Sequence, residues 1–232
     1  MYLLLIGIII ILLYVVYNWC NDIEIKYLDS GIIGPTLLII AGVHGNEPAG
    51  SIYLKKHFKI SKPKKGSIYI IHSPNKLGLL FNNRYLLHRF YHRDLNRNFP
   101  KKDGETAKEP ISIKICEIVN KCDWVLDMHE GWGFMVNGNG SMGSGIFPGN
   151  TTNSLALSKL MLDNLHEINY PEFILTPNHN IQINTLKNYC IYKNKHYVLI
   201  ETSGQNNIQP LHVRLTQIET IIMTTLKYLK MI

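Results

Sequence analysis

Residues 36–48 have the sequence TLLIIAGVHGNEP. After Thr36, the five residues 37–41 are all apolar, which is typical of a buried strand. Two glycines then interrupt the pattern, and a helix is predicted over residues 47–58, because Pro48 is tolerated in the first turn of a helix. A buried strand that runs directly into a helix indicates an α/β fold.

Short apolar runs and helical patterns alternate on both sides of this stretch. Further strands are predicted at residues 23–28, 67–72, 123–128 and 196–201, and further helices at residues 111–122, 151–168 and 211–229. This alternation predicts one α/β domain with a mixed, mostly parallel sheet flanked by helices. The regions 73–110 and 130–150 are rich in Asn, Gly and Pro, and loops of that length are usually functional.

The N-terminal region differs from the rest, because residues 2–19 contain no charged side chain. The run reaches the lower end of the roughly 17–25 residues that a membrane-spanning helix needs. We therefore predict a transmembrane anchor over residues 1–20 and a folded domain over residues 21–232. A cleaved signal peptide fits less well, since no basic residue precedes the run, and a core strand or helix is the remaining alternative. The flanking charges are too balanced to indicate the side of the membrane.

The charged residues are distributed unevenly. The chain has 24 basic and 17 acidic residues, and only five of the basic ones are Arg. Four of these five, Arg84, Arg89, Arg93 and Arg97, fall within fourteen positions, and the guanidinium fork fits a carboxylate or a phosphate. The lysines at 55–65 are typical of a solvated helix end and turn, so no nucleic-acid partner is predicted.

Several common motifs are absent. The four Cys residues have no CxxC spacing, which excludes a zinc ribbon, and their redox state stays open. The sequence at residues 138–143 satisfies GxGxxG, but glycines and a proline follow where a phosphate-binding helix would begin. We interpret this segment as a lid over the candidate site.

Metal-ligating residue types follow two predicted strands. His44 and Glu47 come after the strand at 36–41, and His129 ends the strand at 123–128. Because the carboxyl ends of such strands meet at one edge of a sheet, these side chains are candidate Zn²⁺ ligands. Asp127 is a candidate partner for the second ring nitrogen of His44 or His129. The alternatives are a turn in which Glu47 favours a helix N-terminus, and an Asp127 that caps a loop.

Glu201 follows four apolar residues at the end of a third strand. A carboxylate there is costly unless it has a partner or a chemical role. Near a zinc site it would take a proton from the metal-bound water and pass it to a leaving amine. The alternative is a buried ion pair with one of the clustered arginines.

Four motifs occur in order along the chain: HGNE, R-x-x-x-x-DLNRNFP, DMH and IET-x-GQ. As a set they resemble the succinylglutamate desuccinylase/aspartoacylase family of the zinc carboxypeptidase superfamily, over about residues 23–230. The resemblance implies a zinc carboxypeptidase-like fold and one Zn²⁺ per chain. It also implies specific roles: metal ligands His44, Glu47 and His129; general base Glu201; oxyanion stabiliser Arg89; and substrate-carboxylate ligands Asn96 and Arg97. Arg84 and Arg93, from the same arginine cluster, are the next candidates for holding the carboxylate.

Two departures from the family pattern bear on the substrate. The chain continues for only about thirty residues after Glu201, so we expect the small C-terminal β domain of the acylases to be missing. No Arg lies between Arg97 and Arg214, so a basic contact that the acylases place shortly before the base has no match, unless a lysine substitutes. The candidate lysines are Lys187, Lys193 and Lys195.

The sequence thus predicts a membrane-anchored zinc hydrolase that cleaves an amide bond next to a carboxylate. The expected reaction is deacylation of an N-acyl amino acid. DMHEGWGF and the paired Asn of DLNRNF also resemble peptidoglycan-trimming carboxypeptidases, so removal of a C-terminal residue from a short peptide is the first alternative. A non-catalytic, membrane-tethered binding protein on a hydrolase fold is the second.

Overall fold

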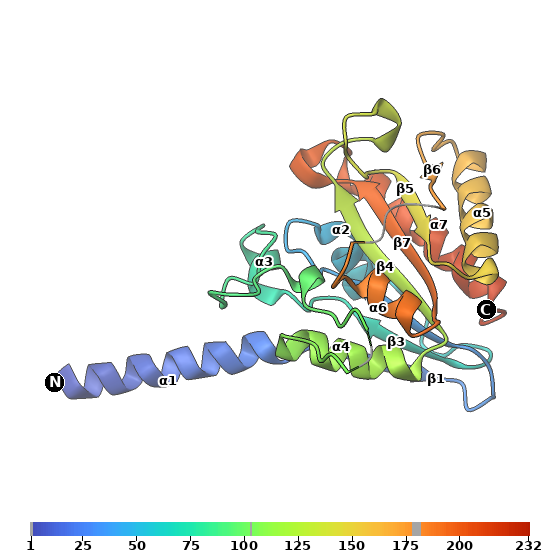
Figure 1. Cartoon of the computed structure of the whole chain (residues 1–232). Coiled ribbons are helices and arrows are strands. Elements are labelled where there is room, and N and C mark those ends of the chain that lie inside the picture. The colour runs from blue at the N-terminus through green and yellow to red at the C-terminus, as the bar shows by residue number, and fades with distance from the viewer. Residues whose placement is uncertain (1, 103, 178–181) are drawn as a thin grey trace.

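The computed structural model describes residues 2–102, 104–177 and 182–232. Within these ranges seven strands form one sheet in the order β1-β3-β2-β4-β7-β5-β6 (Figure 1). The strands are β1 (Lys26–Asp29), β2 (Thr36–Ala41), β3 (Ser67–Ile71), β4 (Trp124–Gly131), β5 (Gly145–Pro148), β6 (Ile174–Leu175) and β7 (His196–Ser203). Only the β1–β3 and β5–β7 pairs are antiparallel, so the predicted mixed, mostly parallel sheet is confirmed.

Helices cover both faces of the sheet (Figure 1). One face packs against α2 (Pro48–Ile52), the π-helical turn η1 (Tyr53–His57), α5 (Thr152–Glu167) and α7 (Leu211–Tyr228). The other face packs against α4 (Pro110–Lys121) and α6 (Leu186–Tyr192). Alternate residues of β2 enter the two cores, with Leu37 and Ile39 on one side and Leu38 and Ile40 on the other. This double burial explains why β2 is apolar along almost its whole length.

The long regions without periodicity contain short elements that the sequence did not predict. They hold α3 (Lys76–Leu80), the 3-10 turns η2 (Leu95–Arg97) and η3 (Met135–Asn137), and β5. β6 and α6, which follow β5, were not predicted from the sequence either. β5 is fully buried, but it is only four residues long, begins with Gly145 and ends with Pro148. Its sequence therefore resembles that of a turn.

The N-terminal helix α1 (Tyr2–Asn21) extends away from the domain (Figure 1). Its window Leu4–Asn21 has a mean hydropathy of 2.1, and 6% of it is buried, so it is not a core helix. By length and composition α1 could cross a membrane, and a signal sequence would pass the same test.

Candidate active site

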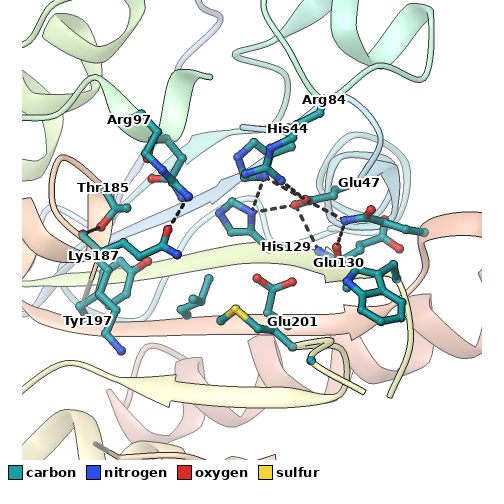
Figure 2. Close-up of a pocket in the computed structure, with 18 residues that line it drawn as sticks. His44, Glu47, Arg84, Arg97, His129, Glu130, Thr185, Lys187, Tyr197 and Glu201 are labelled. Atoms are coloured by element: carbon teal, nitrogen blue, oxygen red, sulfur yellow. Dashed lines mark hydrogen bonds and ion pairs between the residues drawn. The ribbon is translucent and has the colours of Figure 1, made fainter. Parts of the chain in front are cut away.

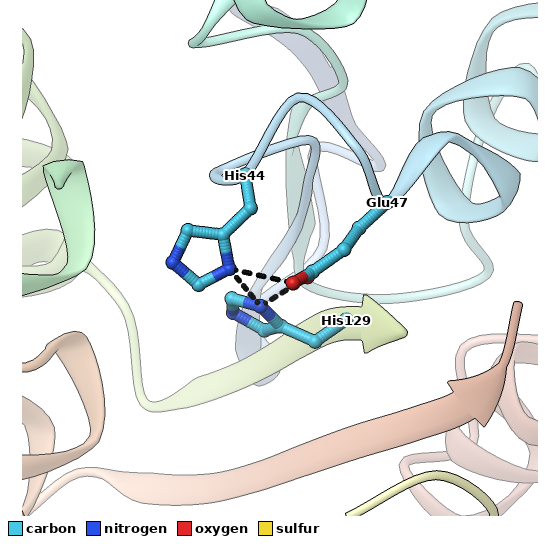
Figure 3. Close-up of side chains that lie close together, drawn as sticks. All are labelled: His44, Glu47 and His129. Carbon is cyan, nitrogen blue, oxygen red and sulfur yellow. Dashed lines mark hydrogen bonds and ion pairs between the residues drawn. The ribbon is translucent and has the colours of Figure 1, made fainter. Parts of the chain in front are cut away.

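Two neighbouring strands and one turn bring the predicted metal ligands together (Figure 3). His44 lies in the turn after β2, Glu47 caps the start of α2, and His129 lies on β4. The turn packs closely against α3 through Gly45, where a Cβ would lie 2.0 Å from the backbone carbon of Gly78. Only glycine allows that approach, which fixes the path of the chain around His44.

The three side chains face a common point. His44 Nδ1 lies 2.8 Å from Glu47 Oε1, His129 Nδ1 lies 2.7 Å from Glu47 Oε2, and the two Nδ1 atoms are 3.1 Å apart. All three residues are buried. Two ring nitrogens and a carboxylate oxygen are therefore aimed at one position, although they come from residues up to 85 apart in the sequence.

The outer nitrogen of each ring contacts a second carboxylate. His44 Nε2 lies 3.2 Å from Asp94 Oδ1, and His129 Nε2 lies 3.1 Å from Asp127 Oδ1. Asp127 also accepts a hydrogen bond of 2.7 Å from the hydroxyl of Tyr197, which holds it in place. The structure thus pairs Asp127 with His129, whereas the partner of His44 is Asp94, which the sequence analysis did not single out for this position.

This donor set fits a divalent metal ion. Two imidazoles and one carboxylate form a common zinc-ligand set, and metal-bound imidazoles usually give their other N–H to a carboxylate. A carboxylate oxygen lies within 3.2 Å of the other nitrogen of His44 and within 3.1 Å of that of His129. A tetrahedral zinc with bonds of about 2.0–2.1 Å keeps its ligand atoms about 3.3 Å apart. The observed distances of 2.7–3.1 Å would have to widen by about 0.2–0.6 Å.

The charge around the rings is also that of a cation site. Burial alone would raise the pKa of Glu47, but the charges and hydrogen bonds of His44 and His129 lower it well below its ordinary value. The pKa of Asp94 is likewise lowered, against the effect of burial, by His44 and then by Arg84. With neutral imidazoles, the carboxylates of Glu47, Asp94 and Asp127 outnumber the Arg84 guanidinium by two negative charges.

The cluster opens into a pocket of about 220 Å³ (Figure 2). Arg84 lies on the same side as His44 and Glu47, Arg97 and Lys187 lie at the opposite end, and Glu201 lies between them. Loop residues Gly140 and Met142 also line the pocket, so the glycine-rich segment predicted to be a lid borders the site. The strand β5 follows this segment, in place of a phosphate-binding helix.

Glu201 lies on β7 directly opposite His129 on β4. Burial, followed by the negative charge of Glu47, raises the pKa of Glu201 to about 8. In the described part of the chain Glu201 forms no ion pair with an arginine, which leaves the buried-ion-pair alternative without support. Glu130, which follows His129 on the adjacent strand β4, does pair with an arginine, Arg214. It also accepts a hydrogen bond of 2.6 Å from the backbone N–H of Ala49.

Three of the predicted substrate ligands line the pocket. Arg84 Nη2 lies 3.0 Å from Asp94 Oδ2, and its Nη1 lies 3.6 Å from Glu47 Oε1. Arg97 donates to the carbonyl of Asn96 at 2.7 Å and to the side chain of Gln182. Asn96 accepts a hydrogen bond of 2.8 Å from the backbone N–H of Leu186, at the start of α6.

The other two arginines of the cluster are not brought to the pocket. Arg89 donates to Glu109 at 2.7 Å and to the Tyr17 hydroxyl at 2.9 Å, and Arg93 lies over the ring of Tyr85. Neither is among the described residues that line the pocket. The expectation that Arg89 stabilises an oxyanion is therefore not met by this geometry, in which Arg84, five positions earlier, lies beside the cluster.

Lys187 is the lysine of the three candidates that lines the pocket. Its side chain is 6% exposed, and its Nζ has no hydrogen-bond partner in the part of the chain that the structure describes. Burial lowers the pKa of Lys187 to about 8. Lys193 and Lys195 instead donate to the Tyr192 hydroxyl and to the Asn120 carbonyl.

Gln205 holds the carboxylate of Glu47 in position. Its Nε2 donates to Glu47 Oε1 at 3.2 Å and to the carbonyl of Glu130, while its Oε1 accepts from Asn46 at 3.0 Å. The sequence placed Gln205 only within the IET-x-GQ motif. Its contact with Glu47 depends on the turn after β7, which no sequence pattern indicates.

Comparison with known proteins bears on the fold and on the family. A search of curated proteins finds no match. The tripeptide-bound cell shape determinant Csd4 from Helicobacter pylori has a TM-score of 0.75 at 22% identity, over 91% of this chain and 56% of that one. A succinylglutamate desuccinylase/aspartoacylase from Rhodobacter sphaeroides has a TM-score of 0.66 at 17% identity, over 90% of this chain and 59% of that one. The ectoine utilization protein EutE (DoeB) from Ruegeria pomeroyi has a TM-score of 0.61 at 17% identity, over 89% of this chain and 60% of that one.

These likenesses confirm the carboxypeptidase-like fold, and this chain spans between half and two thirds of the length of each structure. The sequence model of the succinylglutamate desuccinylase/aspartoacylase catalytic domain matches residues 33–137, which include three of the four motifs. The resemblance predicted from the motifs is thereby confirmed: residues 33–137 carry the catalytic-domain pattern of the succinylglutamate desuccinylase/aspartoacylase family.

Proposed function

We propose that the protein is a membrane-anchored, zinc-dependent hydrolase that cleaves an amide bond next to a carboxylate, and that its substrate is an N-acyl amino acid. The observation that carries the proposal is the arrangement of one pocket. A His₂Glu cluster, a carboxylate of raised pKa and the three cationic side chains of Arg84, Arg97 and Lys187 line the same space of about 220 Å³.

His44, Glu47 and His129 would hold the zinc ion. When bound, zinc in such a site supplies a Lewis acid and a water molecule of lowered pKa. Asp94 and Asp127 keep the two rings oriented with Nδ1 toward the metal position, because each contacts an Nε2 atom. Gln205 restrains Glu47 in the same way.

Glu201 is the proposed general base and acid. It lies in the pocket opposite His129, and a pKa raised to about 8 suits a group that accepts a proton from water and then gives it to a leaving amine. Arg84 takes the role first expected of Arg89. It lies beside Glu47, where a cation would stabilise the negative charge that develops on a carbonyl oxygen.

Arg97 and Lys187 are the proposed anion contacts at the other end of the pocket. Lys187 is a buried ammonium without a hydrogen-bond partner among the described residues, so a substrate carboxylate would satisfy it. Arg97 and Asn96 would bind a polar group of the substrate other than the carboxylate at Lys187. Holding the substrate in one orientation lowers the entropic part of the activation barrier.

Carboxypeptidase action on a short peptide is the second candidate, and Trp132 favours it. This side chain lines the pocket and is 47% exposed, so it offers an aromatic rim to a substrate longer than a single amino acid. The two reactions share the same groups and differ in the length of the substrate.

A hydrolysis screen of the full chain in detergent, with N-acyl amino acids and short peptides, tests the proposal. The matched control is Glu201→Gln, which keeps the shape of the side chain but removes its basicity. We expect release of an amine from one substrate class by the native protein only. Equal turnover by both proteins would contradict the proposed base. Substrate binding without turnover by the zinc-loaded native protein would favour the non-catalytic alternative.

A further inference from the structure

The segment at residues 80–93 begins at the last residue of α3, ends before η2 and has an unusual surface. It carries three Arg and two His, with no acidic residue. Arg84 and Arg89 pair with Asp94 and Glu109, whereas His92 and Arg93 are exposed. Four of its large apolar side chains are mostly exposed: Leu80 at 68%, Phe81 at 64%, Phe90 at 94% and Tyr91 at 83%. Apolar and aromatic side chains beside basic ones, without acidic residues, are typical of a surface that meets an anionic lipid headgroup layer.

This segment lies against the domain end of α1 (Figure 1). Arg89 donates to the Tyr17 hydroxyl at 2.9 Å and to the Asn21 side chain at 2.6 Å. The rings of Tyr17 and His88 form an edge contact with centroids 6.3 Å apart. Just before the segment, Lys76 donates to the carbonyl of Trp19 at 2.9 Å. The segment is thus fixed to the last turns of α1.

Those last turns mark a depth in the membrane. The apolar run of α1 ends in Tyr17 and Trp19, and Tyr and Trp are the residue types that gather where a spanning helix leaves the hydrocarbon. Because Lys76 contacts Trp19, and His88 and Arg89 contact Tyr17, the 80–93 segment is held at the level of the interface. Its exposed Phe90 and Tyr91 would otherwise face water beside the bilayer.

We infer that the 80–93 segment inserts its apolar and aromatic side chains into the headgroup layer of the same bilayer that α1 crosses, as a second point of membrane attachment. The inference rests on the anchoring part of the proposed function. Arg84 belongs to this segment and Asn96 follows it closely, and both line the pocket. Insertion therefore holds the pocket beside the membrane surface.

Fluorescent labelling of single cysteine variants tests the inference. The four native cysteines are buried, so a cysteine introduced at the surface can be labelled selectively. The variants are Phe90→Cys and, as a second position, Phe81→Cys. The matched control is Ile33→Cys, because Ile33 is 100% exposed in the turn between β1 and β2. The full chain is placed in nanodiscs of phosphatidylcholine and phosphatidylglycerol, one chain per disc, and an environment-sensitive label is exposed to a water-soluble quencher.

We expect quenching at positions 90 and 81 to be several-fold weaker than at position 33. Equal quenching at all three positions, in a protein that still sediments with vesicles of the same lipids, would overturn the inference and leave the anchor intact. Failure of the full chain to associate with those vesicles would overturn the anchor, and the inference with it. Protection that appears only with two chains per disc would assign the surface to a second copy of the chain, which also overturns the inference.

Discussion

Asp94 and Asp127 each contact the outer ring nitrogen of one candidate ligand, at 3.2 and 3.1 Å. Replacing either by Asn keeps the size but removes the charge that orients the imidazole. We predict a loss of about 10–100-fold in zinc affinity for Asp94→Asn and for Asp127→Asn, measured by competition with a chelating dye. The exposed Asp163→Asn is the control and should bind zinc as the native protein does.

Glu201 is assigned to proton transfer and not to the metal. Glu201→Gln should therefore retain zinc while kcat falls by roughly 10²–10⁴-fold, because an amide cannot act as a base. Metal content and steady-state kinetics of one preparation separate the two effects. A variant that lost its zinc would show that Glu201 is a ligand.

Replacing Lys187 should increase the stability of the protein and weaken its binding of substrate. Lys187→Met removes a buried ammonium that has no hydrogen-bond partner among the described residues, so the free energy of unfolding should rise near pH 7, while KM for a carboxylate substrate increases. Lys195→Met, which removes a hydrogen bond to a surface carbonyl, is the matched control and should change neither.

The same lysine predicts a pH dependence. Its folded pKa of about 8 lies below the ordinary 10.5, so the unfolded chain binds this proton more readily. Native stability should then rise by roughly 3 kcal/mol between about pH 8 and 10.5 relative to Lys187→Met, since one pKa unit corresponds to about 1.4 kcal/mol. Denaturant titrations of both proteins across this range measure the difference. A constant difference would mean that Lys187 is not desolvated.

At the scale of elements, the turn after β2 depends on its contact with α3. A Cβ on residue 45 would lie 2.0 Å from the backbone of Gly78, and backbone cannot move aside as a side chain does. We predict that Gly45→Ala lowers the free energy of unfolding by about 1–3 kcal/mol and weakens zinc binding, because the turn carries His44. Gly7→Ala, in α1 with open space around it, should leave both unchanged.

β2 and the four central site residues were predictable for the same reason. A strand buried on both faces is apolar along its length, and parallel strands place their carboxyl ends at one edge. That rule brings His44, His129 and Glu201 together although they are far apart in the sequence. The prediction of the edge strand β1 was less accurate. It was predicted at residues 23–28 and lies at Lys26–Asp29, where its bounds are set by pairing with β3 alone.

The arginine cluster shows where such prediction ends. Between α3 and η2 the chain has positive φ angles at Asn82 and His92 and no regular repeat. Sequence spacing therefore could not indicate which arginine turns inward. The structure turns Arg84 toward Glu47 and turns Arg89 toward Glu109. Asp94 could not be predicted as a partner of His44, because the two residues are 50 positions apart and their contact depends on the irregular path of the chain between α3 and η2.

At the scale of the whole molecule, α1 should affect location and not chemistry. Its window Leu4–Asn21 is 6% buried, but Tyr17 and Asn21 contact Arg89, so the helix is best shortened before those contacts. We predict that deleting residues 2–16 moves the protein from the membrane pellet to the soluble fraction, with kcat/KM on a small soluble substrate changed less than about twofold. Precipitation of the shortened protein would mean that the deleted residues belong to the folded domain.

The proposed chemistry depends on whether His44, Glu47 and His129 form one zinc site. Elemental analysis of the purified full chain and of His129→Ala decides this, with a circular dichroism spectrum to show that the variant is folded. We expect about one zinc per native chain and nearly none in the variant, because two ligands hold zinc far more weakly than three. A folded His129→Ala protein that keeps its full zinc content would show that these three residues do not form the zinc site.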